Sequence, residues 1–285
     1  MNWDDRRLRF RKIMEQEICE NPASVFDPIS GRIAEELEYK VGIFAGSIAS
    51  VTILGDPDLL LITLSEFSDQ ALRISRSNKL PLLVDADHGY GNALNVRRTV
   101  QELETSGVAA LTIEDTELPI SYGAYNNPSL LSIDEGIGKM KAAIEAREDP
   151  NLSIIARTSA FQLSNDEDAI NRAKAYENAG VDAIFFAGID KKEQLEELSN
   201  NTSIPIFIAP TGNELYDKTY LASKNVKICL IGHHPLKASI QAVYDTLKSL
   251  KDGVPTTELK NIASRELIDK VIKKGKYEAL IKRYL

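Results

Sequence analysis

Hydrophobic and polar positions divide the chain into two kinds of segment that alternate. Short, nearly all-apolar runs have the pattern of buried strands, and each is followed by a longer segment with the spacing of an amphipathic helix. The predicted strands are 23–26, 41–44, 82–84, 108–113, 152–156, 181–186, 204–208 and 226–231. The predicted helices that follow them are 30–39, 61–76, 95–105, 134–147, 166–179, 192–198, 214–223 and 236–250. The pattern therefore predicts a chain built from repeated strand–helix units.

These units favour one fold class within α/β proteins. Apolar strands that alternate with helices are typical of parallel sheets covered on both faces, and eight units predict a (β/α)8 TIM-type barrel. Segments 106–110 and 179–183 resemble each other, as expected for repeats of one unit. No glycine-rich dinucleotide fingerprint follows the first strand, which argues against an open doubly wound sheet.

Three segments lie outside the repeats: a charged amphipathic helix at 4–17, a long irregular segment at 116–131, and a helical tail. We expect a catalytic barrel domain over 1–253 and a C-terminal helical tail over 254–285, with breaks at Ser264 and Gly275. Apolar residues of the tail, Ile268, Val271 and Ile272, need a surface to cover them, and we expect another subunit to supply it. A homodimer or homotetramer is therefore predicted.

Composition and charge narrow the class of protein. The apolar fraction of 43% suits a soluble globular domain, and a net charge of -8 argues against nucleic acid as a partner. No apolar run has membrane-spanning length, and the first ten residues lack the apolar core of a signal peptide. Cys19 and Cys229 have no metal-ligand or redox spacing, so we interpret them as reduced packing residues. A cytoplasmic location is predicted, with no membrane partner.

Polar residues gather where the predicted strands end. The carboxyl ends of the strands form the catalytic face of such a barrel. The residues found there are Asp27, Ser47, Asp85, Asp87, Glu114, Arg157, Thr211 and His233. Any one of them could be a helix cap or a structural ion pair, but the set as a whole favours a functional site.

The stretch 82–95, LLVDADHGYGNALN, carries the most specific signal. Asp85 and Asp87 can point the same way from a strand end, because side chains alternate along a strand. Two such carboxylates repel each other unless a cation or hydrogen-bond donors offset the charge. Mg²⁺ suits oxygen ligands and keeps waters that a substrate can displace. Taken alone, the pattern is weak and favours a solvated turn with acidic caps; the rest of the chain reverses that preference.

Several motifs together resemble the isocitrate lyase and phosphoenolpyruvate mutase superfamily. The matching pieces fall in order along the barrel, at 56–58 with 62–64, 85–92, 113–115 and 155–158. The resemblance implies a (β/α)8 barrel whose C-terminal helix is swapped between subunits. It also implies a site for Mg²⁺, or Mn²⁺, and for an α-keto or α-hydroxy acid substrate.

The resemblance also implies roles for individual residues. Asp85 would bind the metal directly, while Asp58, Asp87 and Glu114 would hold it through water. Ser47 and its backbone neighbours, with Arg157, would hold the substrate carboxylate and the developing enolate oxygen. These implied roles remain expectations until the site is described.

One loop distinguishes subgroups of the superfamily. The C–C lyases carry a Lys-Lys/Arg-Cys-Gly-His signature whose Cys acts as an acid, whereas the corresponding segment 117–125 has neither Cys nor His. Residues 23–28 and 87–96, with Gly232-His233, resemble the oxaloacetate decarboxylase subgroup, in which the imidazole of His233 would reach the substrate. Thr211 and Ser159 depart from that pattern, since Tyr and Asn are expected there.

The expected function is Mg²⁺-dependent decarboxylation of oxaloacetate to pyruvate and CO2 through an enolate, with Arg157 and His233 as catalytic residues. One alternative is a C–C lyase or hydrolase acting on a related keto or hydroxy diacid, similar to methylisocitrate lyase. Another is an inert binding protein that kept the barrel. His88 has two open interpretations, a backbone hydrogen bond in its glycine-flanked turn or a direct role.

Overall fold

The protein is an eight-stranded α/β barrel, as the alternating pattern predicted. The computed structural model describes residues 3–123 and 128–285. The strands lie in chain order and each pairs in parallel with the next. They are β1 (Ala23–Ser24), β2 (Gly42–Ala45), β3 (Leu82–Asp85), β4 (Ala110–Glu114), β5 (Ser153–Thr158), β6 (Ala183–Ala187), β7 (Ile206–Ala209) and β8 (Val226–Cys229).

The sheet closes on itself through residues just before β1. Glu20 forms a parallel bridge with Ile228 of β8. Its amide donates to the Lys227 carbonyl at 2.9 Å, and its carbonyl accepts from the Cys229 amide at 2.9 Å. The last strand therefore meets the segment that leads into the first, and because the bridge is parallel, the carboxyl ends of both strands face the same side of the barrel.

Helices surround the strands close to the predicted positions. They are α1 (Asp4–Glu15), α2 (Pro28–Glu36), α3 (Gly46–Ala49), α4 (Leu64–Ser77), α5 (Ala93–Thr105), α6 (Ile133–Ala146), α7 (Ala160–Leu163), α8 (Asp166–Ala179), α9 (Lys192–Asn201), α10 (Lys218–Ser223), α11 (His234–Lys251), α12 (Arg265–Val271) and α13 (Lys274–Tyr284). A π-helical turn, Ser50–Leu54, follows α3, and a 3-10 turn spans Thr256–Glu258. The short helices α3 and α7 were not predicted, because a single turn leaves no periodic signal.

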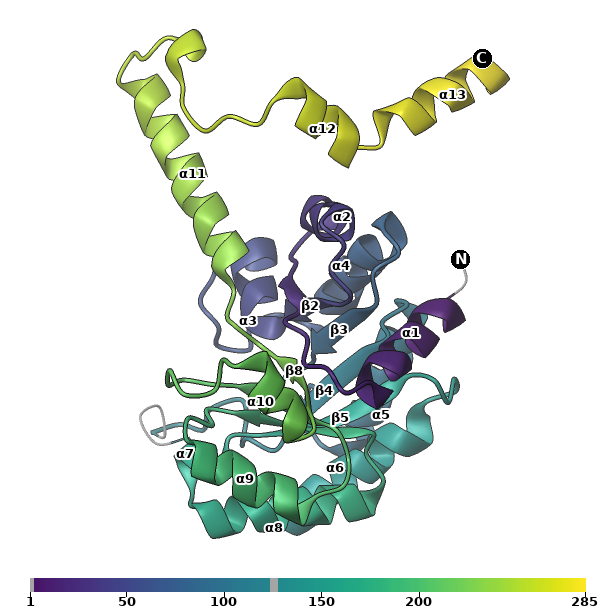
Figure 1. Ribbon diagram of the computed structural model, residues 1–285, viewed down its shortest axis with the longest axis vertical. Helices are drawn as coiled ribbons and strands as arrows, with labels where there is room; N and C mark the ends of the chain where they lie inside the picture. The colour runs from purple at the N-terminus through teal and green to yellow at the C-terminus, as the bar shows by residue number, and fades with distance from the viewer. Residues whose placement is uncertain (1–2, 124–127) are drawn as a thin grey trace.

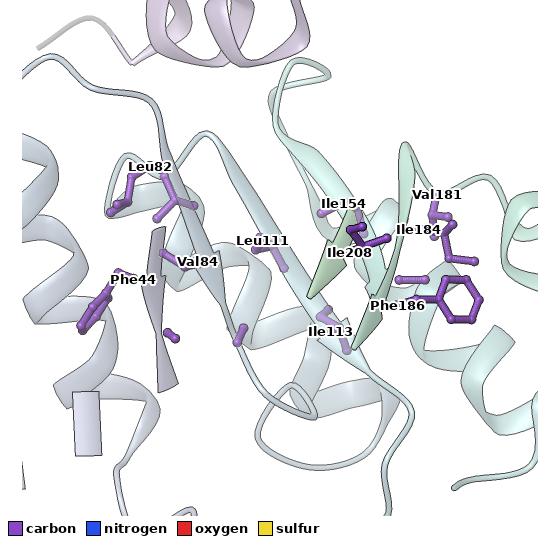
Figure 2. Close-up of a cluster of buried hydrophobic side chains, with 14 of the residues drawn as sticks. Phe44, Leu82, Val84, Leu111, Ile113, Ile154, Val181, Ile184, Phe186 and Ile208 are labelled. Carbon is purple, nitrogen blue, oxygen red and sulfur yellow. The ribbon is translucent and has the colours of Figure 1, made fainter. Parts of the chain in front are cut away.

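Alternate residues of each strand face two different cores. Leu82 and Val84 point outward into the layer between strands and helices, together with Phe44 and Phe186 (Figure 2). Leu83, between them in sequence, belongs to the barrel interior. Both faces of the parallel strands are thus buried, which explains why the strand sequences are almost entirely apolar.

Helix α1 closes the amino-terminal end of the barrel. Phe10, Ile13 and Met14 pack into the barrel interior, whereas Leu8 is exposed. Arg6 and Arg7 are buried, and both donate to backbone carbonyls of the barrel, Arg6 to Ser75 and Asn78 and Arg7 to Val108 and Glu104. These bonds hold α1 against the carboxyl-terminal ends of α4 and α5.

The C-terminal helices differ from the prediction in two details. Helix α12 begins after Ser264, as predicted, but the second break falls at residues 272–273, and Gly275 lies inside α13. Val271 was predicted to need another subunit, yet it is buried within this chain, where α12 lies against α2 and Lys273 pairs with Glu35 at 2.7 Å. Ile268 and Ile272 remain exposed.

Helix α11 runs away from the barrel (Figure 1). Exposed apolar side chains follow one another along it, namely Ile240, Val243, Tyr244, Leu247 and Leu250. None of the helices in the described ranges combines the length and hydropathy needed to cross a membrane.

Candidate active site

A cavity of about 380 Å³ opens at the carboxyl ends of β2 to β5. Six of the predicted site residues line it: Ser47, Asp58, Asp85, Asp87, Glu114 and Arg157. Its other walls are apolar or neutral, formed by Leu59, Leu60, Leu118, Pro119, Ile120 and Ser121. A larger cavity beside Cys19 and Lys218, at the opposite end of the strands, contains none of the predicted site residues.

Strand register brings three polar side chains of this cavity, together with Thr112 behind them, into one network. Asp85 lies beside Thr112, and Glu114 lies beside Arg157. One carboxylate oxygen of Asp85 accepts from the Thr112 hydroxyl at 2.7 Å, and the other accepts from Arg157. The same guanidinium reaches Glu114 at 3.2 Å. Burial lowers the pKa of Arg157, but the carboxylates of Asp85 and Glu114 outweigh it and raise that pKa.

The turn after β3 is held by a separate donor at each of its carbonyls. The Gly89 amide donates to the Ala86 carbonyl at 2.9 Å, and the Glu114 amide donates to the Asp87 carbonyl at 2.8 Å. Lys139 donates to the His88 carbonyl at 2.9 Å, and the Thr99 hydroxyl donates to the Gly89 carbonyl at 2.9 Å. This turn therefore has little freedom to move.

Asp87 occupies a constrained position in this turn. Its φ is +48°, in the left-handed region that non-glycine residues seldom adopt. Its carboxylate lies directly over Gly46, where any Cβ would overlap it. One of its oxygens is buried and has no hydrogen-bond partner among the described residues. Burial raises its pKa well above the ordinary value, and the nearby Asp85 and Glu114 raise it further.

The donor set fits a divalent cation. Four carboxylates, Asp58, Asp85, Asp87 and Glu114, line the cavity with one cation, Arg157, and the buried ammonium group of Lys139 lies behind the turn that carries Asp87. When all are ionised, two negative charges remain, which one divalent ion neutralises. Within the described ranges, no three His, Cys, Asp or Glu side chains are arranged to hold an ion directly. An ion with one direct ligand and several bound waters, as Mg²⁺ prefers, suits this arrangement.

Asp58 is the most exposed of the four carboxylates. It lies on the loop before α4 rather than on a strand. Burial of its carboxyl group raises its pKa, and the neighbouring charge of Asp85 raises it further, while Arg157 lowers it. Asp58 thus belongs electrostatically to the same cluster.

The structure separates three strand-end residues from this cavity. Asp27 caps α2, accepting from the Ser30 amide at 2.6 Å, so its role is structural. Thr211 is exposed and, like His233, does not line the cavity. His233 forms a 2.7 Å hydrogen bond between its Nδ1 and the Ser24 hydroxyl. Burial lowers the pKa of His233, and the charge of Asp85 acts in the opposite direction.

His88 is buried, and its backbone carbonyl rather than its ring holds the turn. Nδ1 of the ring has no partner among the described residues. Burial, and then the charge of Lys139, lower the pKa of His88 to about 4. The imidazole is therefore neutral near neutral pH.

Several residues of the site were missed by the sequence reasoning. Thr112 lies in the middle of an apolar strand, and Lys139 lies in a helix with an ordinary amphipathic pattern. A polar residue inside a buried strand was the one available signal for Thr112. No local signal marks Lys139, because its partner lies 51 residues away.

Comparison with known proteins gives consistent matches over the chain. The family model described as phosphoenolpyruvate phosphomutase matches residues 10–251. A Rhodopseudomonas palustris (strain BisB18) protein named oxaloacetate decarboxylase is 54% identical, over 94% of this chain and 93% of its own length. A phosphoenolpyruvate phosphomutase structure from Streptomyces platensis subsp. rosaceus has 26% identity and a TM-score of 0.87, over 98% and 99% of the two chains. A phosphonopyruvate hydrolase, solved with oxalate and Mg²⁺, shares the fold with 24% identity and a TM-score of 0.85, over 98% and 99% of the two chains.

Proposed function

The chain belongs to the phosphoenolpyruvate phosphomutase family, and from this premise we propose that it is an oxaloacetate decarboxylase. The reaction converts oxaloacetate to pyruvate and CO2. The relative with this name shares 54% of its residues with the chain over nearly the full length of both proteins. Features of the cavity favour decarboxylation over other reactions of the family.

The observation that carries the proposal is the uneven lining of the cavity. Asp85, Glu114 and Arg157 stand at the ends of strands, whereas Leu59, Leu60, Leu118 and Ile120 lie on the loops between the π-helical turn and α4 and between β4 and α6. Arg157 is the one cation among the described lining residues, and two carboxylates already pair with it. The cavity thus offers a bound diacid one polar end and one apolar end.

Decarboxylation suits this asymmetry. The carboxylate beside the keto group belongs at the polar end, so the remote carboxylate lies toward the apolar wall. An unpaired carboxylate is poorly stabilised in an apolar environment, whereas CO2 is neutral. Loss of CO2 therefore removes the negative charge of the remote carboxylate from the apolar wall, where it is least stabilised.

Metal binding is the second part of the proposal. Asp85 would hold Mg²⁺, or Mn²⁺, directly, and Asp58, Asp87 and Glu114 would orient its waters. When bound, such an ion would supply Lewis-acid chemistry, drawing electron density toward an oxygen of the substrate. In this chain the clearest sign of such a site is the buried oxygen of Asp87, which has no hydrogen-bond partner among the described residues.

The remaining residues bind and orient the substrate. Ser47 lies in the first turn of α3 and lines the cavity, and with Arg157 it would stabilise developing negative charge. The bond from His233 Nδ1 to Ser24 leaves Nε2 available to contact the substrate. Solvent can reprotonate the enolate, so segment 117–125 needs no Cys or His.

We also propose that the chain forms a homodimer or homotetramer in the cytoplasm. The apolar side chains exposed along α11 would be covered by another copy of the chain, as in a swapped C-terminal helix. Cys19 and Cys229 are free and buried, which suits a reducing compartment.

The proposal is tested by measuring pyruvate formation from oxaloacetate with Mg²⁺ and with EDTA. Because Mg²⁺ itself promotes loss of CO2 in solution, Asp85→Ala protein at equal Mg²⁺ is the control. We expect Asp85→Ala to lose both metal binding and turnover. His233→Ala should lose turnover while its Mg²⁺ affinity stays near normal. Equal rates for wild type and Asp85→Ala would refute the proposal.

A further inference from the structure

Lys139, on α6, is a buried lysine that the proposed chemistry does not use. Its exposed fraction is 3%, although lysine is among the residues least often buried. Its ammonium group donates to the His88 carbonyl at 2.9 Å. The bond links α6 to the turn that follows β3 and carries Asp87.

We propose that Lys139 is a positioning residue for the divalent cation, acting through the 86–89 turn. This inference rests on the metal site proposed above. The His88 carbonyl lies between Asp87 and Gly89, so holding it fixes the direction in which the Asp87 carboxylate points. Without a donor, this buried carbonyl would lose its partner, and the turn would relax to recover one.

The backbone conformation of the turn indicates why the hydrogen bond from Lys139 is needed. Asp87 has a φ of +48° and Gly89 a φ of +78°. A left-handed non-glycine residue costs free energy and persists where its surroundings over-determine it. The other carbonyls of the turn are held by two backbone amides and by the Thr99 hydroxyl. Lys139 thus supplies the one charged donor of the four.

The charge of Lys139 adds a second contribution. Burial lowers its pKa, but Glu135, Glu114 and Asp115 act in the opposite direction and favour the ammonium form. Together with Arg157, it offsets part of the repulsion among the carboxylates before a metal arrives. An apolar side chain could fill the same space without the cost of burying an ammonium group, so packing alone does not account for a lysine here.

The test measures Mg²⁺ binding to metal-free protein by isothermal titration calorimetry. Lys139→Met should raise the Mg²⁺ Kd by about tenfold to a hundredfold, the range found for residues that orient metal ligands. Saturating Mg²⁺ should restore most of kcat, because the turn is displaced and no reacting group is lost. A purely structural role would lower Tm and leave Kd unchanged.

Two further variants make the result decisive. Lys141→Met, on the same helix but exposed, should keep the wild-type Kd. Thr99→Val removes the donor to the Gly89 carbonyl without changing charge, and it should raise Kd several-fold. A wild-type Kd in Lys139→Met would overturn the proposal. If that variant does not fold, a wild-type Kd in Thr99→Val would overturn it instead.

Failure of the proposed function would be recognised separately. A wild-type protein that binds Mg²⁺ but leaves oxaloacetate unchanged would refute the decarboxylase activity alone. The comparison of Mg²⁺ affinities would still decide the role of Lys139, because it does not depend on turnover.

Discussion

Replacing Arg157 with alanine should destabilise the metal-free protein far more than the Mg²⁺-loaded protein. The guanidinium is about four-fifths buried, with 20% of the side chain exposed, and it pairs with Asp85 and Glu114. At the 3.2 Å separation from Glu114, Coulomb attraction with an effective dielectric constant of about 20 amounts to about 5 kcal/mol. The cost of desolvating both groups offsets much of this attraction.

The net loss of unfolding free energy depends on the two carboxylates, Asp85 and Glu114, that the substitution leaves without their guanidinium partner. Removing one partner of a buried ion pair costs about 3–5 kcal/mol, because the other charge stays buried and unpaired. Here two carboxylates lose the same partner, so the metal-free Arg157→Ala protein should lose an amount within that range. A bound divalent cation supplies replacement positive charge, so the loss with saturating Mg²⁺ should be clearly smaller. Activity should fall as well, by about 3 kcal/mol in kcat/KM, or roughly a hundredfold, from the lost charge-assisted contact with substrate.

Urea unfolding followed by circular dichroism measures this difference. Wild type and Arg157→Ala are compared at one protein concentration, in EDTA and in saturating Mg²⁺, since oligomerisation makes stability depend on concentration. Arg172→Ala is a useful comparison, because Arg172 also forms a buried pair, with Asp115, but does not line the cavity. Its loss should be the same with and without Mg²⁺. Equal losses for Arg157→Ala in the two conditions would refute the electrostatic reasoning.

Three further outcomes are expected from the structure. Gly46→Ala should weaken Mg²⁺ binding by at least tenfold in calorimetry, because the added Cβ displaces the Asp87 carboxylate, and an unchanged Kd would contradict the contact. Cys19 and Cys229 should resist Ellman's reagent at pH 8 until urea is added, because burial raises the pKa of their thiols to about 12 and about 11; fast reaction of the native protein would contradict this. A chain ending at Gly253 should sediment as a smaller, less stable species than the full chain, and an unchanged oligomer would refute the role assigned to the tail.

The fold could be predicted from the sequence because its signal is local and repeated. Leu82, Leu83 and Val84 are all apolar since one face of the strand meets the helices and the other fills the barrel. The first strand was predicted too long, at 23–26 instead of Ala23–Ser24. Strand pairing ends there because the chain continues directly to Asp27, the N-cap of α2. The apolar run alone does not show where the strand gives way to the helix cap.

The site could be predicted in part, for a similar reason. Asp85, Glu114 and Arg157 stand at strand ends, so topology alone places them at one face of the barrel. Asp27 follows the same rule and is nevertheless a helix cap. Lys139 contributes from a helix through a contact 51 residues away, and only the three-dimensional packing of α6 reveals it.

The tail shows the opposite limit. The apolar residues of the tail indicated that part of its surface is covered, which holds for Val271. The pattern could not indicate whether this chain or another subunit covers a given residue. Val271 is covered by this chain, while the stripe on α11 has no partner among the described residues. Amphipathic spacing reports that a face needs burial and carries no information about the partner.

The proposed reaction is decarboxylation of oxaloacetate with a divalent cation held by Asp85. The most direct measurement compares initial rates of the purified protein with oxaloacetate, isocitrate, methylisocitrate and phosphonopyruvate, each with Mg²⁺ and with EDTA. We expect oxaloacetate to be the fastest substrate, pyruvate and CO2 to form in equal amounts, and EDTA to abolish the reaction. Faster cleavage of methylisocitrate than of oxaloacetate would contradict the proposed reaction, because a segment without Cys or His would then support C–C lyase chemistry.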